Sequence, residues 1–249
     1  MGRRVFKGIF VDENIAIRDA KKSDAEFLSW VILEAAHSGH DLSFWEAIIP
    51  ESQQERLEFI RYLSSSVKSS VCYYENFIIA EEEFKPISAI SAYNSSIITR
   101  ANLIAALYKA QARFCWDHKR VERVRPMASA FISCIPQVPD NCWVIEWVAT
   151  RHEYRRQGIV KYLLKKILLK GLSESNCNQF QINFAIDNTP ARTAYEGVGF
   201  RYIDENRNEK FAEYFGYPGI ARMQITREEL EQRNFVRAYL NNETVFQEP

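Results

Sequence analysis

The chain has 249 residues, with 32 Lys and Arg balancing 32 Asp and Glu, and 47% of its residues are hydrophobic. Zero formal charge argues against a nucleic-acid partner, and the apolar content argues against a disordered chain. No run approaches the ~18 apolar residues of a membrane span, and residues 1–9 carry no apolar core of a signal peptide. The lack of such a run predicts no membrane association. The five cysteines form no C-x-x-C pair, which predicts no metal site and a reducing, cytoplasmic location.

In chain order, the first half predicts a strand, a helix, a loop, a second helix and a hairpin. These elements cover residues 15–18, 23–36, 38–50, 52–63, and 73–80 with 86–93. Ser23 is the expected N-cap of the first helix because Glu26 follows three residues later. Residues 94–125 carry a helical pattern that ends in a basic run from His118, and residues 131–135 have strand character. Balanced charge elsewhere favours a solvated helix face for the basic run.

The second half is more regular. It predicts strands at 143–149, 180–186, 202–204 and 221–225, and helices at 159–172, 188–197 and from 226 onward. In the helix at 159–172, apolar side chains recur on one face while Lys161, Lys165 and Lys166 are expected to face out. Asn188 is a candidate cap, with Pro190 in the first turn of its helix.

An anion site is predicted between the strand at 143–149 and the helix at 159–172. A helix N-terminus presents unpaired N–H groups and a partial positive charge. Gly158 allows close approach of a ligand, and Arg155, Arg156 and Lys161 add positive charge nearby. A pyrophosphate suits such a site, although the spacings of a Walker loop and of a dinucleotide-binding turn are both absent.

Two motifs carry a resemblance to a known family. Arg155-Arg156-Gln157-Gly158-Ile159-Val160 is similar to the [RQ]-x-x-G-x-[GA] signature of the GCN5-related N-acetyltransferases (GNAT), which bind acetyl-CoA. Residues 188–200 resemble that family's N-x-x-A-x-x-x-Y-x-x-x-G-F element, and residues 146–150 its central strand. The departure is Val160, which stands where the family usually has Gly or Ala and whose bulk narrows the approach of the phosphates.

The resemblance implies an α/β acyl-CoA N-acyltransferase fold, with a twisted, mixed, mostly antiparallel sheet flanked by helices. It implies a single N-acetyltransferase domain over residues 1–249, with a helical insertion at about 94–140 and a C-terminal helical extension at about 226–249. The strands near Glu146 and Gln181 are expected to part so that acetyl-CoA, as co-substrate, slots between them.

The resemblance also assigns roles to residues. Backbone groups of Val148, Ala149 and Thr150 would pair with the pantetheine arm like an added strand. The segment from Arg155 through Gln157, Gly158, Ile159 and Val160 to Lys161 would bind the pyrophosphate. Asn188 would bind the pantetheine or the helix–strand junction.

Two side chains are the catalytic candidates. Glu146 would accept the amine's proton, directly or through a water, because an ordinary amine is mostly protonated at pH 7. Tyr195 would protonate the leaving thiolate, and the N–H of Val148 would polarise the thioester carbonyl. Structural alternatives are a strand-face ion pair for Glu146, simple packing for Tyr195 and helix capping for Asn188.

The predicted function is acetyl-CoA-dependent transfer of an acetyl group to an amine, directly within a ternary complex. No His or acid lies near Cys177 in a thiol-transferase pattern, which argues against a covalent acyl-cysteine. The acceptor is a small-molecule or peptide amine, with His40, Asp41 and Trp45 as candidate contacts, and a homodimer is possible. Two alternatives remain: an acyltransferase for a longer acyl group, and a catalytically silent CoA-binding or protein-interaction module.

Overall fold

The computed structural model describes residues 14–241, in which seven strands form one sheet of order β1-β2-β3-β4-β5-β7-β6. Neighbouring strands are antiparallel except β4 and β5, which are parallel. The strands are β1 (Ile15–Asp19), β2 (Phe77–Glu82), β3 (Lys85–Asn94), β4 (Cys142–Thr150), β5 (Gln179–Ala185), β6 (Arg201–Arg207) and β7 (Gly219–Thr226). The predicted α/β class with a mixed, mostly antiparallel sheet is therefore confirmed.

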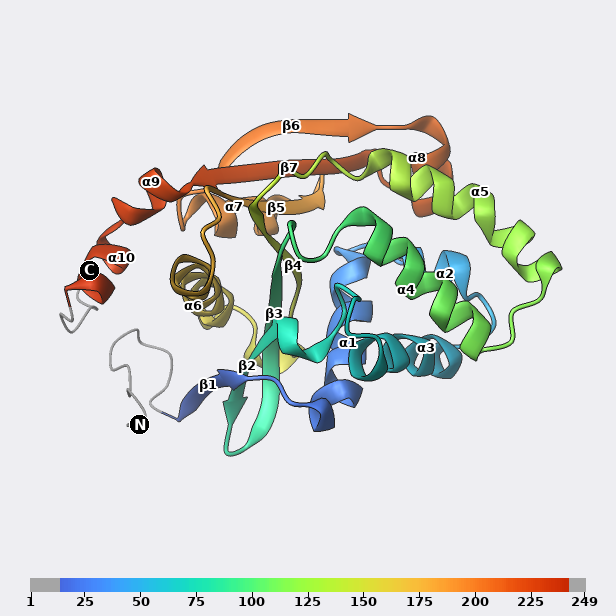
Figure 1. The fold of residues 1–249 in the computed structure, drawn as a ribbon, viewed down its shortest axis with the longest axis horizontal. Coiled ribbons are helices and arrows are strands. Elements are labelled where there is room, and N and C mark those ends of the chain that lie inside the picture. Colours follow the sequence, from blue (N-terminus) through green and yellow to red (C-terminus); the bar gives the residue numbers. More distant parts are fainter. Residues whose placement is uncertain (1–13, 242–249) are drawn as a thin grey trace.

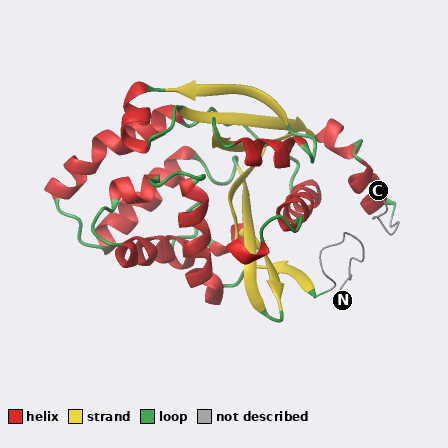
Figure 2. Ribbon diagram, turned by 180° about the vertical axis from the view of Figure 1, so that it is seen from behind, coloured by secondary structure: helices red, strands yellow, loops and turns green. Residues whose placement is uncertain are grey.

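Helices cover both faces of this twisted sheet (Figures 1 and 2). One face carries α1 (Ala25–His37), α2 (Phe44–Ile48), α3 (Gln53–Ser66), α4 (Arg100–Arg113), α5 (His118–Cys134) and α8 (Glu209–Phe215). The other face carries α6 (Ile159–Glu174), α7 (Thr189–Glu196), α9 (Arg227–Glu231) and α10 (Asn234–Leu240). None of the helices within residues 14–241 combines the length and apolar character needed to cross a bilayer.

Each face of the sheet has its own apolar core. On the α6 face, Leu163 and Ile167 of the helix pack with Phe180 and Ile182 of β5, as the helical stripe and the strand alternation predict. Lys165 and Lys166 were expected to face out, and this is wrong. Both are half-buried, because their ammonium groups lie over the rings of Phe235 and Tyr162 respectively.

A β-bulge interrupts β4. Between the pairs Ser91–Glu146 and Ala89–Ala149, β4 advances three residues while β3 advances two. Trp147 takes up the extra residue with φ of 46°, a left-handed conformation that is uncommon outside glycine. Because the bulge disturbs the ladder, the carbonyl of Glu146 accepts a hydrogen bond from the hydroxyl of Ser91 at 3.0 Å.

The bulge lies where β4 and β5 part. Their parallel pairing joins Cys142–Ile145 to Gln179–Ile182 and ends there. The five residues of β4 from Glu146 to Thr150 continue without a partner in β5 (Figure 1). The expected separation of the two central strands is therefore present, and it leaves one backbone edge of β4 open.

Several local predictions differ from the structure. Residues 131–135 were expected to form a strand, but they end α5, where Phe131 packs on Phe211 of α8. Tertiary packing thus overrides the β propensity of this segment. Residues 94–125 form the end of β3 and parts of two helices, which are separated by a turn where Cys115 has φ of 53°.

Other differences lie at element ends. Ser23 is not a cap: residues 22–24 form a 3₁₀ turn, and Asp24 precedes α1 while its carboxylate binds Arg18. The strand predicted from Tyr73 begins only at Phe77, because Tyr74–Asn76 form another 3₁₀ turn. The C-terminal extension contains two short helices, and its residues 242–249 lie outside the described part of the chain, as do residues 1–13.

Gly171 sets the distance between α6 and the sheet. A Cβ there would lie 2.7 Å from Phe180 and 2.8 Å from Trp143. We expect Gly171→Ala to destabilise the protein by about 1–3 kcal/mol through overpacking, although alanine is the better helix former. In the control Gly197→Ala, the nearest atoms would be carbonyl oxygens at 3.4 Å, so little change is expected. Thermal unfolding of both variants tests this, and equal melting temperatures would contradict it.

Candidate active site

The turn before α6 presents a row of backbone amides. Arg156 and Gly158 both have left-handed backbones, with φ of 63° and 78°, and the first helical hydrogen bond runs from the amide of Tyr162 to the carbonyl of Gly158. The amides from Gly158 to Lys161 therefore have no acceptor within the helix. A Cβ at Gly158 would meet nothing within 4 Å, so this N-terminus is open to a ligand. The geometry fits a phosphate group.

Positive side chains flank this turn in two different ways. Arg156 and Lys161 are exposed and line the cavity described below, which places their charge beside the free amides. Arg155 instead donates hydrogen bonds to the carbonyl of Thr150 at 3.1 Å and to the carboxylate of Glu34 at 2.6 Å. Its guanidinium thus braces the end of β4 against α1.

A cavity of about 1370 Å³ runs from this turn into the gap between β4 and β5 and on towards α4 and α5. Its volume exceeds that of most small-ligand sites. From the predicted cofactor site, the cavity is lined by Val148, Ala149, Thr150, Arg155, Arg156, Gly158, Ile159, Val160, Lys161 and Asn188. Gln157 is exposed beside it and bonds the carbonyl of Glu153.

Glu146 lines this cavity immediately before the bulge. It is half-buried, and burial raises the pKa of its carboxyl group from 4.5 to about 7. Cys72 and Tyr93 line the same region. Burial, and after it the charge of Glu146, raise the pKa of the Tyr93 hydroxyl. Near neutral pH, Glu146 is therefore poised between its neutral and ionised forms, as a general base requires.

Tyr195 reaches the cavity from α7. Only 7% of the residue is exposed, and its ring meets that of Phe184 edge to face at 6.0 Å. Burial raises the pKa of its hydroxyl well above 10, so the group stays protonated at neutral pH. No described residue forms a hydrogen bond with that hydroxyl, which leaves its proton available to a ligand.

Asn188 joins two loops at the edge of the cavity. Its side-chain oxygen accepts a hydrogen bond from the amide of Ala191 and so caps α7, while its amide group donates to the carbonyl of Ser38 after α1. Next to it, His40 lies 3.1 Å from the carboxylate of Asp187 and stacks on Tyr217. These contacts tie the α1–α2 loop to the β5–α7 loop.

Of the three residues predicted to contact the acceptor, one lines the cavity and two do not. Trp45 is buried and lines the cavity. His40 and Asp41 are not among the lining residues: His40 is engaged by Asp187, and Asp41 is exposed to solvent. Direct contact of these two residues with an acceptor stays a prediction. Within residues 14–241, no group of three or more His, Cys, Asp or Glu is placed to hold a metal ion.

Comparison with known proteins identifies the family. Residues 104–200 match the model of the acetyltransferase (GNAT) family. This segment is a GNAT domain. The match contains β4, the amide-bearing turn, α6, β5 and α7, which together line the part of the cavity next to the free amides. Over this segment it agrees with the family and the enzyme type that the sequence motifs predict.

Solved structures share the fold of this GNAT domain at low sequence identity. An acetyltransferase crystal structure has a TM-score of 0.63 at 16% identity, covering 85% of this chain and 98% of its own. An N-acetyltransferase from Staphylococcus aureus has a TM-score of 0.58 at 18% identity, with coverage of 84% and 100%. A spermidine N-acetyltransferase chimera from Vibrio cholerae has a TM-score of 0.52 at 15% identity, covering 89% of this chain and 100% of its own. No curated protein sequence matches this chain.

Several lining residues escaped the sequence analysis. Cys72, Tyr93, Phe131 and Trp147 come from four separate segments and meet only in the folded chain. Trp147 could have been found, because it follows Glu146 in the quoted strand motif. Nothing in the local pattern around the other three distinguishes a cavity wall from ordinary apolar packing.

The raised pKa of Glu146 has a consequence for stability. The folded state holds this proton more tightly than the unfolded chain, so ionisation destabilises the fold as pH rises from about 4.5 through 7. Glu146→Gln should therefore leave stability nearly unchanged at pH 4.5 and raise it by on the order of 3 kcal/mol at pH 8. Chemical denaturation of both proteins across this range measures the difference, and a gain that does not depend on pH would contradict it.

Proposed function

We propose that this chain transfers an acetyl group from acetyl-CoA to a primary amine within a ternary complex. The observation that carries the proposal is the continuous cavity that leads from the free amides at the start of α6, through the gap between β4 and β5, to Glu146. The free amides suit phosphates, the gap between the strands suits an extended thiol arm, and Glu146 suits an amine.

The cofactor half is suited to acetyl-CoA. The amides from Gly158 to Lys161, with Arg156 and Lys161, would hold the pyrophosphate. The open edge of β4 from Val148 to Thr150 would pair with the amide groups of the pantetheine arm as a missing strand would. Val160 is half-buried in the cavity wall, where its branched side chain narrows the passage without closing it.

Two groups would move protons during the reaction. Glu146 would remove a proton from the incoming ammonium, so that the amine nitrogen can attack the thioester carbon as the C–S bond breaks. Tyr195, protonated because it is buried, would donate its proton to the departing sulfur. The acylated nitrogen would lose its second proton to solvent, and a proton from solvent would restore the tyrosine hydroxyl. The N–H of Val148, at the bulge in β4, would stabilise the negative charge that develops on the carbonyl oxygen.

Direct transfer is favoured over a covalent acyl-cysteine. Cys72 lines the cavity, but burial raises the pKa of its thiol to about 12. A thiol in that state is a poor nucleophile at neutral pH, because the thiolate is the reactive form. Because the thiol of Cys72 stays protonated, it does not compete with direct transfer in a ternary complex, in which Glu146 would serve the amine.

The acceptor is a small-molecule or peptide amine. The spermidine N-acetyltransferase chimera shows that proteins of this fold include amine acetyltransferases, and we extend that reaction class, not that substrate, to this chain. A cytoplasmic location and a possible homodimer are part of the same proposal. The location rests on the scattered, unpaired cysteines. Phe235 and Val236 of the last helix are buried within this chain, so the homodimer stays a prediction.

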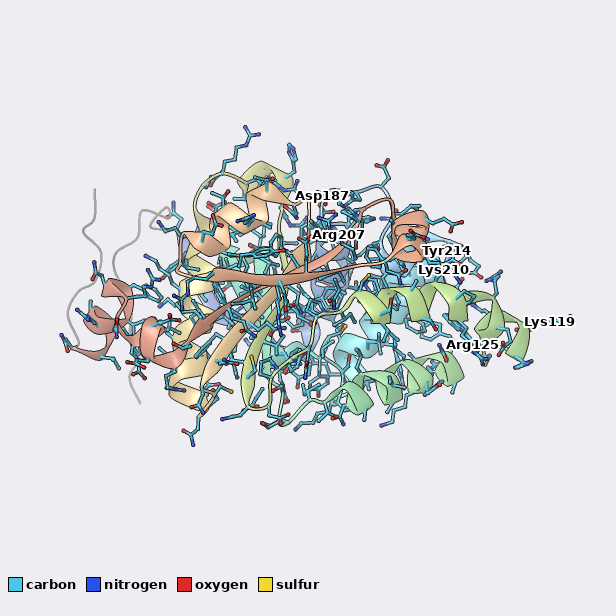
Figure 3. All side chains as sticks on the ribbon, turned by 90° about the horizontal axis from the view of Figure 1, so that it is seen from above. Lys119, Arg125, Asp187, Arg207, Lys210 and Tyr214 are labelled. Carbon is cyan, nitrogen blue, oxygen red and sulfur yellow. The ribbon has the colours of Figure 1, made fainter. Side chains whose placement is uncertain are left out.

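Isothermal titration with acetyl-CoA and with CoA tests the cofactor site. We expect binding in the micromolar range and at least about a tenfold loss in Arg156→Glu, because a carboxylate would face the phosphates. Lys119→Glu is the matched control: it makes the same change of charge at the far end of α5 (Figure 3). Loss of affinity in both variants would point to a general charge effect, and no binding by the parent protein would refute the proposal.

Tyr195→Phe distinguishes an enzyme from a silent CoA-binding module. The variant keeps the ring that packs on Phe184 but has no proton to donate. We expect thiol release in the presence of an amine to fall by about 10²–10⁴-fold, while affinity for acetyl-CoA stays unchanged. Undiminished thiol release would remove Tyr195 from the mechanism. No release by the parent protein with any amine would favour the module.

A further inference from the structure

The acceptor half of the cavity is mainly apolar. Beyond Glu146 it is walled by side chains from α2, β3, α4 and α5, which the cofactor does not need. The main apolar side chains of this wall, called here the acceptor chamber, are Phe44, Trp45, Tyr93, Leu103, Leu107 and Phe131. The segment from Arg100 to Cys134, whose role the sequence left open, therefore supplies much of the chamber wall.

Aromatic rings dominate the chamber near Glu146. The rings of Phe44 and Phe131 lie 4.6 Å apart, and those of Trp45 and Trp147 lie 6.3 Å apart. Ring faces of this kind favour contact with an apolar body. The chamber thus offers contact surface to an acceptor whose amine is attached to a bulky hydrocarbon.

The carboxylates of the cavity are distributed unevenly. Four acidic residues line it in the described part of the chain. Glu34 is paired with Arg155, Asp204 is paired with Arg222, and Asp140 is exposed in the loop before β4. Glu146 is the one carboxylate of the four that is both shielded and without an ion-pair partner among residues 14–241.

We propose that the acceptor chamber selects a primary monoamine attached to a bulky apolar group, such as an aryl or branched alkyl amine. The proposal rests on the acetyl transfer proposed above and names the substrate class. One ammonium would pair with the carboxylate of Glu146. The second ammonium of a polyamine would lose its water against aromatic rings and would have no carboxylate to pair with. An acidic acceptor would bring a second negative charge next to Glu146.

Acceptor preference tests the class directly. With saturating acetyl-CoA, we expect kcat/KM for 2-phenylethylamine to exceed that for putrescine and spermidine by about tenfold or more, within the range that apolar pockets achieve. Equal or higher values for the two polyamines, or for a peptide N-terminus with polar side chains, would overturn the proposal.

Filling the chamber gives a second test. Ala128 of α5 is half-buried and lines the cavity, whereas the next residue, Ser129, is exposed and does not. Ala128→Phe should raise KM for 2-phenylethylamine by about tenfold, with acetyl-CoA affinity unchanged. Ser129→Phe should behave like the parent protein. Equal KM values in the two variants would place the acceptor elsewhere.

A charge placed in the chamber should shift the preference. Ile104 lines the cavity from α4 and is 38% exposed, so a carboxylate there should be tolerated by the fold. We expect Ile104→Glu to raise kcat/KM for putrescine relative to 2-phenylethylamine by about tenfold. Tyr108→Glu, one turn further along α4 and outside the lining, is the control. An equal shift in both variants would refute the chamber's role.

A binding measurement tests the acceptor chamber independently of acetyl transfer. Titration of the parent protein, saturated with CoA, with 2-phenylethylamine and with putrescine needs no turnover. Selective binding of the aryl amine without acetylation would leave the chamber intact and refute acetyl transfer. Acetylation of other amines without this selectivity would refute the chamber proposal alone, and failure to bind either amine together with no turnover would refute both.

Discussion

The end of hydrogen bonding between β4 and β5 after Ile145 is the constraint on which the site depends. Two parallel strands that stayed paired would leave no passage between the free amides before α6 and the carboxylate of Glu146. The bulge at Trp147 accompanies this separation, because an extra residue bends a strand and increases its twist. The hydroxyl of Ser91 donates a hydrogen bond to the displaced carbonyl of Glu146 and so satisfies that acceptor.

The separated ends of β4 and β5 are not held by hydrogen bonds to each other, so other parts of the chain must support them. At the free end of β4, Arg155 links the carbonyl of Thr150 to Glu34 of α1, and Arg151 lies over the rings of Phe27 and Trp30. At the end of β5, Asn188 bonds the loop that follows α1. Helix α1 therefore contacts the chain beyond both strands, which explains how the gap persists without direct pairing across it.

Much of this arrangement is readable from the sequence. The strand before Arg155, the glycine at 158, the apolar stripe of α6 and the cap at Asn188 are local features, each set by residues within one or two turns. Local rules therefore predict a phosphate site and the order of elements from Trp143 to Phe200, and the family resemblance adds the catalytic candidates Glu146 and Tyr195. They also predict the parting of the strands, through the family resemblance that those motifs carry.

Only the tertiary structure decided what surrounds Glu146. Its pKa near 7 comes from burial by segments distant in the chain, and Cys72, Tyr93 and Phe131 reach the same cavity from α5 and from the region around β2 and β3. The helical identity of residues 131–135 and the brace made by Arg155 likewise depend on partners far along the sequence. The sequence by itself determined the amide-bearing turn and the strand before it, the proposed sites for phosphate and thioester, because these features are local. The acceptor chamber was decided by long-range packing, which residue patterns do not encode.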